Sequence, residues 1–210
     1  MRSPADRLVA ELRGRIGDER VLSAVRAVPR DRFVPADLRD RAWENEPLPI
    51  GCDQAISQPL VVARMCELLE LDGSERVLDV GTGSGYHAAL LAWLAAEVYS
   101  IELHEELSRQ AARALAEAGA RVSLSVGDGR LGLPEHAPYD AINVAAAAAG
   151  QVPAALVEQL APGGRLVAPV EEEGDQYLAL LRKHRGRVRS TRLERVRFVP
   201  LVERPATGRG

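Results

Sequence analysis

The residues with the clearest chemical meaning form a glycine-rich turn, Asp79-Val-Gly-Thr-Gly-Ser-Gly-Tyr86. The turn follows a buried-strand pattern over residues 76–80 and precedes a helical pattern over residues 86–96. In dinucleotide-type folds, such a turn lies at the carboxyl edge of a parallel sheet, where ligands bind. Glycines let the backbone approach a ligand without a Cβ clash and permit positive φ angles. The segment therefore predicts a cofactor-binding turn.

The spacing of these glycines favours one cofactor over another. A pyrophosphate-binding fingerprint has the spacing G-x-G-x-x-G, and this chain has Tyr86 where the third glycine would stand. Asp79, which ends the preceding strand, is unfavourable beside a diphosphate but suits a cationic amino-acid or sulfonium ligand. The turn therefore favours S-adenosylmethionine over NAD.

Two further acidic residues follow strand patterns in the same order along the chain. Glu102 ends the second strand, seventeen residues after Gly85, where a carboxylate can accept hydrogen bonds from both hydroxyls of a ribose. NAD sites use the same device, so Glu102 does not discriminate between the two cofactors. Asp128, flanked by Gly127 and Gly129 after the third strand, can accept a hydrogen bond from an adenine amino group. As the third member of an ordered set, Asp128 is expected to be functional.

A proline-bounded segment over residues 46–59 precedes this region and excludes a regular helix. Pro59 fits the first turn of a helix that continues through Val62, Met65 and Leu69. Ser57 is therefore expected in a loop just before a helix N-terminus, where backbone N–H groups favour an anionic ligand.

Other reactive residues show no spacing that indicates chemistry. His87, His104, His136 and His184 are scattered without a partner at metal-ligand spacing, so no metal site is predicted. His87 lies on the helix that begins at the glycine turn and is expected to border the cofactor. We find no nucleophile–base arrangement. The arginine-rich residues 182–197 favour a solvated strand pair over a nucleic-acid surface.

The elements that must position these residues alternate along the chain. Strand patterns at 76–80, 98–102, 122–126, 139–145 and 165–170 alternate with helical patterns at 86–96, 105–118 and 153–160. Residues 176–181 and 196–201 resemble antiparallel edge strands joined through a basic turn region. The pattern predicts an α/β fold, a Rossmann-like doubly wound and mostly parallel sheet with antiparallel C-terminal edge strands and an N-terminal helical segment.

Composition agrees with one enzyme-sized domain. The chain has 210 residues, 46% hydrophobic and 27% charged, with a net charge of −3, which excludes a wholly disordered chain and argues against broad nucleic-acid binding. No apolar run approaches the roughly 20 residues of a membrane span, and the charged N-terminus has no signal-peptide pattern. Because Cys52 and Cys66 form no disulfide framework, we expect reduced thiols, a cytoplasmic location and a monomer. We divide the domain into a segment 1–58 with the active-site loop, a cofactor-binding core 59–170 and C-terminal edge strands and tail 171–210.

Several longer runs resemble the bacterial type of the protein-L-isoaspartate O-methyltransferase family, within the class I S-adenosylmethionine-dependent methyltransferases. The resemblance spans about residues 20–203 and is most specific at Ile56-Ser57-Gln58-Pro59 and in the tail 196–202. Other matching runs are Pro47-Leu-Pro-Ile-Gly, Val77-Leu-Asp-Val-Gly-Thr-Gly-Ser-Gly-Tyr, Gly127-Asp-Gly-Arg, Ala137-Pro-Tyr-Asp-Ala-Ile and Gln159-Leu-Ala-Pro-Gly-Gly-Arg-Leu-Val.

The resemblance implies methyl transfer to the free α-carboxylate of L-isoaspartyl residues in damaged proteins and peptides. The ester then collapses to a succinimide, whose hydrolysis partly restores aspartate. The family's active-site serine matches Ser57. Implied cofactor-binding positions are Gln54, Ile56, Ser57, Asp79, Gly81, Thr82, Gly83, Ser84, Gly85, Glu102, Leu103, Asp128 and Gly129.

The chain departs from the family pattern around the expected acceptor site. Family members usually carry Gly-x-Gly-Gln-Thr-Ile-Ser, and this chain has Asp53 for the second glycine and Ala55 for the threonine. Ala145 stands where a threonine is usual, and the proline expected to close that run is absent at residues 149–150. Asp53 could repel an anionic acceptor, whereas Ala55 and Ala145 remove hydroxyls.

Three alternatives therefore stay open. The chain could be a Rossmann-like carboxyl methyltransferase with another peptide or small-molecule acceptor. It could be an NAD-dependent oxidoreductase, although Tyr86 in place of the third glycine argues against this. It could also be a non-catalytic module that binds the cofactor.

Overall fold

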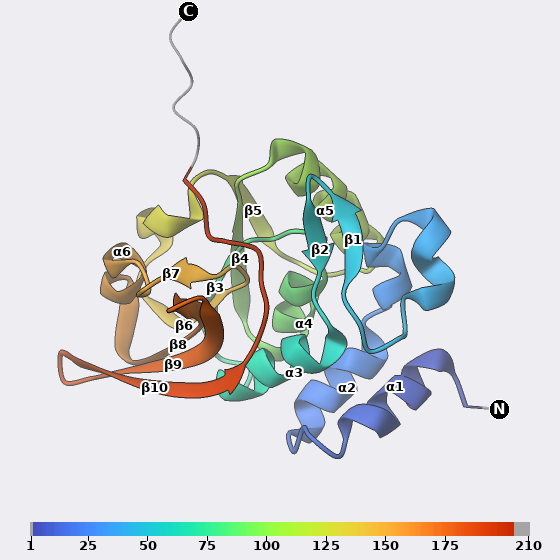
Figure 1. The fold of residues 1–210 in the computed structure, drawn as a ribbon, viewed down its shortest axis with the longest axis horizontal. Coiled ribbons are helices and arrows are strands. Elements are labelled where there is room, and N and C mark those ends of the chain that lie inside the picture. The colour runs from blue at the N-terminus through green and yellow to red at the C-terminus, as the bar shows by residue number, and fades with distance from the viewer. Residues whose placement is uncertain (1, 204–210) are drawn as a thin grey trace, which may run out of the picture.

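The structure is a computed structural model that describes residues 2–203 (Figure 1). Its main sheet has the strand order β10-β9-β8-β6-β3-β4-β5, and β7 pairs with β8 beside this row. The pairs from β5 to β8 are parallel, and β8-β9 and β9-β10 are antiparallel. The predicted fold class is confirmed. The strands are β3 (Arg76–Val80), β4 (Glu97–Glu102), β5 (Ser123–Val126), β6 (Tyr139–Val144), β7 (Ala148–Ala149), β8 (Leu160–Glu172), β9 (Asp175–His184) and β10 (Arg187–Arg195).

Helices and short turns join these strands. The α-helices are α1 (Pro4–Leu12), α2 (Glu19–Ala27), α3 (Pro59–Leu68), α4 (Tyr86–Leu94), α5 (Glu105–Glu117) and α6 (Ala154–Glu158). The 3-10 helices are η1 (Arg30–Phe33), η2 (Ala36–Arg41), η3 (Gly129–Leu131) and η4 (Pro134–His136). Ser3 caps α1 in a capping box with Asp6. Pro59 opens α3, as the sequence predicted.

Apolar side chains cover both faces of the sheet. Val77 belongs to the cluster that contains the apolar faces of α1–α5, and its neighbour Leu78 belongs to the cluster that contains Leu156 of α6. Successive strand residues point to opposite faces, so one strand contributes to both clusters. The chain leaves β3 toward β4 and β5, then returns to place β6 on the other side of β3. This reversal makes the carboxyl ends of β3 and β6 the expected ligand crevice.

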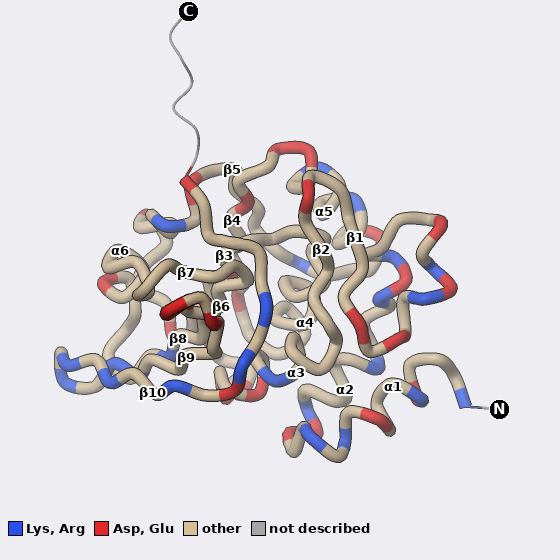
Figure 2. The backbone as a smooth tube through the Cα atoms, viewed as in Figure 1, with Lys and Arg blue, Asp and Glu red and all other residues tan. Residues whose placement is uncertain are grey.

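The C-terminal edge differs from the prediction. Residues 196–201 were expected to pair with residues 176–181, but β10 is formed by the basic residues 187–195. The turn before it has Arg185 and Gly186 at φ 48° and 75°, which suits a tight hairpin. β10 is almost wholly exposed and lacks the apolar alternation that identifies a strand. Figure 2 shows Lys and Arg positions along this hairpin, and the solvated strand pair expected there is present.

Residues 196–201 instead cross the carboxyl edge of the main sheet. The Ala147 N–H donates to the Val199 carbonyl at 2.8 Å, and the Leu201 N–H donates to the Ala147 carbonyl at 2.7 Å. The apolar residues of this segment therefore pack over the edge of the sheet and do not form an added edge strand. Residues 204–210, the end of the predicted tail, lie outside the described residues.

The proline-bounded segment contains a small hairpin that the sequence did not predict. β1 (Leu48–Gly51) pairs antiparallel with β2 (Gln54–Ile56). Cys52 and Asp53 at the tip both have positive φ, 51° and 55°, as a two-residue hairpin turn of the primed type requires. The hairpin carries the chain directly to Ser57 and α3.

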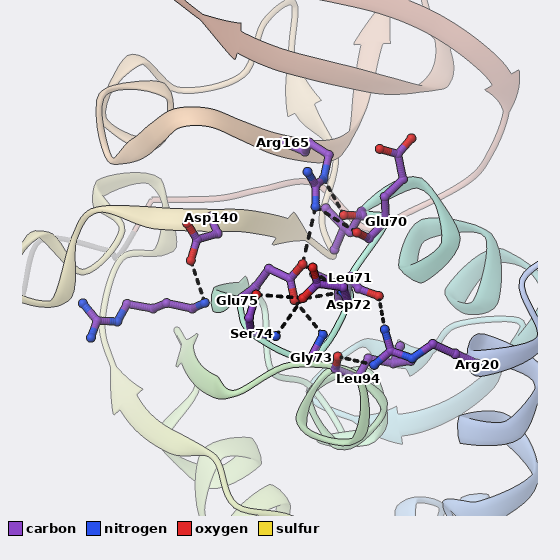
Figure 3. Close-up of polar contacts among 12 residues, drawn as sticks. Arg20, Glu70, Leu71, Asp72, Gly73, Ser74, Glu75, Leu94, Asp140 and Arg165 are labelled. Carbon is purple, nitrogen blue, oxygen red and sulfur yellow. Dashed lines mark hydrogen bonds and ion pairs between the residues drawn. The ribbon is translucent and has the colours of Figure 1, made fainter.

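A polar network ties β8 to the opposite edge of the fold, where the strands begin (Figure 3). Arg165 on β8 donates from Nε to the Leu69 carbonyl at 2.5 Å and from Nη2 to the Glu70 carbonyl at 2.9 Å. Its guanidinium also lies 3.6 Å from Glu75 Oε1. Glu75 is buried and accepts from the Asp72 N–H at 2.9 Å. Arg165 thus compensates a buried carboxylate and two carbonyls at the end of α3.

No helix in the described part of the chain is long and apolar enough to cross a lipid bilayer.

We predict that Arg165→Gln lowers the free energy of unfolding by about 1–3 kcal/mol, because the Leu69 and Glu70 carbonyls lose their donor and the buried Glu75 carboxylate loses its cation. Urea unfolding measures the change. Arg13→Gln is the matched control, because Arg13 pairs with Glu19 on the surface, where ion pairs contribute about 0–1 kcal/mol. Equal losses for the two variants would contradict the importance of the network.

Candidate active site

A pocket lies at the carboxyl ends of β3, β4 and β6, between the β1-β2 hairpin and the C-terminal segment that crosses the sheet edge (Figure 1). It is lined by Gln54, Ala55, Ile56, Ser57, Val62, Val80, Gly81, Thr82, Gly83, Ser84, Tyr86, His87, Ile101, Glu102, Leu103, His104, Gly129, Ala145, Ala146, Val199, Pro200, Leu201 and Val202. The structure therefore brings together segments that lie far apart in the sequence.

Most predicted cofactor-binding residues line this pocket. Ten of the predicted positions do so, namely Gln54, Ile56, Ser57, Gly81, Thr82, Gly83, Ser84, Glu102, Leu103 and Gly129. Asp79, Gly85 and Asp128 are not among the lining residues. His87, which was expected to border the cofactor, is among them.

The glycine turn needs glycine for its backbone shape. Gly81, Gly83 and Gly85 have φ angles of 91°, 52° and 88°, a region that other L-residues rarely occupy. A Cβ on Gly85 would also lie 3.2 Å from the Ala111 Cβ on α5. Tyr86, in place of the fingerprint's third glycine, is buried and belongs to the apolar cluster beneath the pocket. The turn is thus shaped by its glycines and anchored by Tyr86.

Glu102 fixes the turn from the neighbouring strand. Its Oε2 accepts from the Gly83 N–H at 2.8 Å, and its Oε1 accepts from the His104 N–H at 2.9 Å. The side chain is 5% exposed and lines the pocket. Each carboxylate oxygen has a second lone pair, so Glu102 can hold the turn and also accept from ribose hydroxyls.

Asp79 lies beneath the turn. It is fully buried, and it accepts from Asn143 Nδ2 at 2.7 Å and from Ser100 Oγ at 2.8 Å. Asp79 is not among the lining residues of the pocket, and its interaction with a cationic ligand stays a prediction. Ser100 Oγ is also 2.6 Å from Thr82 Oγ1, so a hydrogen-bonded chain links Asp79 to a pocket-lining residue.

Burial raises the pKa of Asp79 to about 6. Hydrogen bonds from Asn143 and Ser100 lower this pKa, but their effect is smaller than that of burial. The carboxylate form is therefore less favourable in the folded protein than in the unfolded chain, although it still predominates at pH 7. Ser100 and Thr82 connect this carboxylate to the pocket through their hydroxyls.

Asp128 is held by Arg130 next to the pocket. Its Oδ1 accepts from the Arg130 N–H at 2.9 Å, and the two carboxylate oxygens face the Arg130 guanidinium at 2.8–3.2 Å. Its neighbour Gly129 lines the pocket, and a Cβ there would lie 2.6 Å from Val80 Cγ1. The adenine contact of Asp128 stays a prediction.

Ser57 lies at the junction of two spaces. It lines the pocket and also a groove of about 580 Å³ that is lined by Pro47, Ala55, Ser57, Gln58, Val61, Ala145, Arg195, Val196, Arg197, Phe198 and Val199. Its hydroxyl makes no hydrogen bond within residues 2–203. This places an available donor next to the glycine turn, as the sequence hypothesis required.

The departures from the family pattern have different positions. Ala55 and Ala145 line both the pocket and the groove. The site itself therefore lacks the two hydroxyls that the family pattern would supply. Asp53 lies exposed at the tip of the β1-β2 hairpin and lines neither space. The expectation that Asp53 acts near the acceptor is therefore not supported by its position.

Some site residues were missed in the sequence. Asn143 joins Asp79 to His87, whose Nδ1 lies 3.2 Å from Asn143 Nδ2. Burial lowers the pKa of His87 to about 3, so the imidazole is neutral. An amide within the otherwise apolar run of residues 141–144 was the available signal. The described residues contain no cluster of His, Cys, Asp and Glu able to hold a metal ion.

The sheet, the three glycines with positive φ and the carboxylate after the next strand define a class: a Rossmann-like methyltransferase that uses S-adenosylmethionine. Comparison with known proteins gives the family. A model of the protein-L-isoaspartate(D-aspartate) O-methyltransferase family matches residues 4–206, and the chain belongs to this family.

Relatives and solved structures agree with this assignment. The chain is 52% identical over 188 residues to a protein-L-isoaspartate O-methyltransferase of Methanoculleus marisnigri, covering 89% of this chain and 85% of the relative. It is 52% identical over 205 residues to one of Anaeromyxobacter dehalogenans strain 2CP-C, covering 95% and 98%.

Two solved structures of protein-L-isoaspartate O-methyltransferases share the fold. One has a TM-score of 0.85 and 26% identity, covering 95% of this chain, which spans 66% of that protein. Another, from Plasmodium falciparum in complex with S-adenosyl-L-homocysteine, has a TM-score of 0.81 and 26% identity, covering 94% and 97%.

We predict that Asp79→Asn stabilises the protein above pH 6 by up to about 3 kcal/mol, because no charge is then buried. The pKa of Asp79 rises from its ordinary 3.8 to about 6 on folding, so the folded state binds more protons between these values. The wild type therefore loses stability as pH rises from about 4 through 6, and the variant lacks this loss. Urea unfolding across pH 4–8 checks it, with exposed Asp37→Asn as control. A pH-independent difference between Asp79→Asn and wild type would contradict the buried charge.

Proposed function

We propose that this chain transfers a methyl group from S-adenosylmethionine to the free α-carboxylate of L-isoaspartyl residues in damaged proteins and peptides. The observation that carries the proposal is the position of Ser57, whose unpaired hydroxyl lines both the glycine-turn pocket and the adjoining groove. A cofactor in the pocket and a peptide in the groove would meet at this residue.

The pocket fits the proposed cofactor better than a dinucleotide. Its lining within residues 2–203 contains neither lysine nor arginine, so nothing there neutralises a diphosphate. Glu102 supplies the carboxylate that a ribose requires, and Asp79 adds negative charge behind the turn. When bound, S-adenosylmethionine supplies an electrophilic methyl group, which forms a bond to a carboxylate oxygen as its bond to sulfur breaks, leaving the neutral thioether.

The proposed acceptor requires no general base in the site. A carboxylate with a pKa near 4 is already ionised at neutral pH and has no proton to lose. His87 has its pKa lowered to about 3 and is held by Asn143. The residues of the site therefore need to orient the acceptor and exclude water, which can contribute up to roughly 7–11 kcal/mol.

Ser57 is suited to orient the carboxylate. Its hydroxyl can donate one hydrogen bond to an acceptor oxygen, leaving the other oxygen to face the methyl group. Ser57 thus acts as a donor and not as a covalent nucleophile.

The groove suits a peptide. Its volume lies within the range of ligand sites, and its walls include apolar Pro47, Val61 and Phe198. Arg195 and Arg197 at its edge favour the approach of a negatively charged acceptor. These features support a peptide carboxylate as the substrate.

Another acceptor is the second candidate, because Ala55 and Ala145 remove two hydroxyls from the walls of both spaces. Incubation with a tritiated methyl donor and isoaspartyl peptides, aspartyl peptides or small carboxylic acids separates the candidates. We further propose a cytoplasmic location, since Cys52 is an exposed free thiol and Cys66 a buried one. We also propose that the protein is a monomer. Light scattering tests the monomer.

We predict that Ser57→Ala lowers kcat/KM on an isoaspartyl peptide by about 10-fold or more, equal to about 1.4 kcal/mol of lost orientation. Initial rates with a tritiated methyl donor measure the loss, and Ser123→Ala on exposed β5 is the control. An unchanged kcat/KM would refute the role of Ser57.

We predict that Glu102→Ala weakens S-adenosylhomocysteine binding about 10-fold or more, because both the ribose acceptor and the anchor of the Gly83 N–H are lost. Calorimetry measures the dissociation constant. Glu105→Ala, at the exposed start of α5, should bind as the wild type does. Equal affinity of the Glu102 variant would overturn this assignment.

A further inference from the structure

We propose that Arg30 is the positioning residue that holds Ser57 in register with the glycine turn for methyl transfer. This inference rests on the function proposed above and assigns a part of its machinery outside the pocket, since Arg30 is not among the lining residues.

Arg30 is a fully buried cation whose hydrogen bonds all go to backbone carbonyls. It lies in η1 with 0% exposure. Nη1 donates to the Ala42 carbonyl, and Nη2 donates to the Glu46 carbonyl at 3.2 Å and to the Ser57 carbonyl at 3.0 Å. One guanidinium therefore ties three separate segments of chain together, and one of them carries the proposed catalytic hydroxyl.

The same guanidinium also touches the cofactor side of the site. Its Cζ lies 5.5 Å from the centre of the Tyr86 ring, within the range of a cation–π contact. Tyr86 directly follows Gly85, opens α4 and lines the pocket. Arg30 therefore contacts the helix that anchors the glycine turn and the segment that carries Ser57.

Burial of this charge is unfavourable in itself. Moving a cation from water into a protein interior costs several kcal/mol unless dipoles or charges compensate it. Burial accordingly lowers the pKa of Arg30 to about 10. An apolar residue would fill the volume without this penalty, but it would leave three carbonyls without their donor and Ser57 without its link to η1.

The far end of the Ser57 segment is anchored by Asn45. Gln58 Nε2 donates to the Asn45 carbonyl at 2.9 Å, and the Leu60 N–H donates to Asn45 Oδ1 at 3.0 Å. Ser57 is thus held on both sides through its backbone while its hydroxyl stays unpaired. Misplacement of a reacting group by about 1 Å can reduce a rate by about 100-fold, so such anchoring bears directly on kcat.

Lysine cannot replace arginine here without loss. The planar guanidinium presents donors in a fixed fork, whereas an ammonium is a single point on a flexible stem. Arg30→Lys keeps the charge but cannot reach all three carbonyls in the same geometry. The Ser57 segment should therefore shift, whereas the lysine keeps a cation beside the Tyr86 ring and the glycine turn stays in place.

The test compares Arg30→Lys with Arg20→Lys. Arg20 is a matched control, because it also donates to two backbone carbonyls, those of Leu71 and Leu94, away from Ser57. We expect Arg30→Lys to lower kcat on an isoaspartyl peptide by about 10- to 100-fold at a temperature where both variants are folded. The dissociation constant of S-adenosylhomocysteine should stay within about two-fold, and Arg20→Lys should retain wild-type kcat.

A double-mutant cycle with Ser57→Ala separates positioning from general damage. If Arg30 acts through Ser57, Arg30→Lys should change kcat by less than about two-fold in the Ser57→Ala background. Additive losses, or a wild-type kcat for folded Arg30→Lys, would overturn the inference.

Two controls keep the test decisive. If Arg30→Lys does not fold, Asn45→Ala replaces it, because Asn45 is the partly exposed anchor of the same segment. A wild-type kcat for Asn45→Ala would contradict positioning through this segment. A wild-type protein that methylates no isoaspartyl peptide would refute the proposed function itself, which the wild-type arm shows directly.

Discussion

The proposed methyl transfer depends on the distance between two backbone segments that border the pocket. One is the glycine turn, held by the Glu102 carboxylate through the Gly83 N–H. The other is the segment of Ser57, held by Arg30 and Asn45. An ionised acceptor needs no proton removed, so catalysis consists of bringing one oxygen in line with one methyl group. Rigid anchoring of both segments is the physical means to that end.

Buried polar groups appear where this anchoring is required. Three polar side chains are buried, namely those of Asp79, Arg30 and His87. Burial disfavours the charged form of each and lowers stability. Asp79 reaches the pocket through Ser100 and Thr82, and Arg30 reaches it through Ser57. Thr82 and Ser57, which these hydrogen bonds reach, line the pocket, so the buried groups lower stability but hold the geometry of the site fixed.

Local backbone chemistry could be predicted from the sequence, and long-range placement could not. The glycine spacing, Pro59 and strand alternation gave the turn, the start of α3 and the parallel sheet. The side-chain direction of Asp79 could not be predicted because β3 is buried on both faces, so its pattern does not say which way a side chain points. Residues 196–201 looked like a strand because cover over the sheet edge also demands apolar residues. Arg30 was missed because its partners lie 12, 16 and 27 residues away.

A crystal structure with S-adenosylhomocysteine and an isoaspartyl peptide tests the central claim most directly. The account predicts the peptide in the groove, with one oxygen of its free α-carboxylate about 2.5–3.0 Å from Ser57 Oγ and the other directed at the cofactor sulfur. A carboxylate bound away from Ser57, or a cofactor outside the glycine-turn pocket, would contradict it.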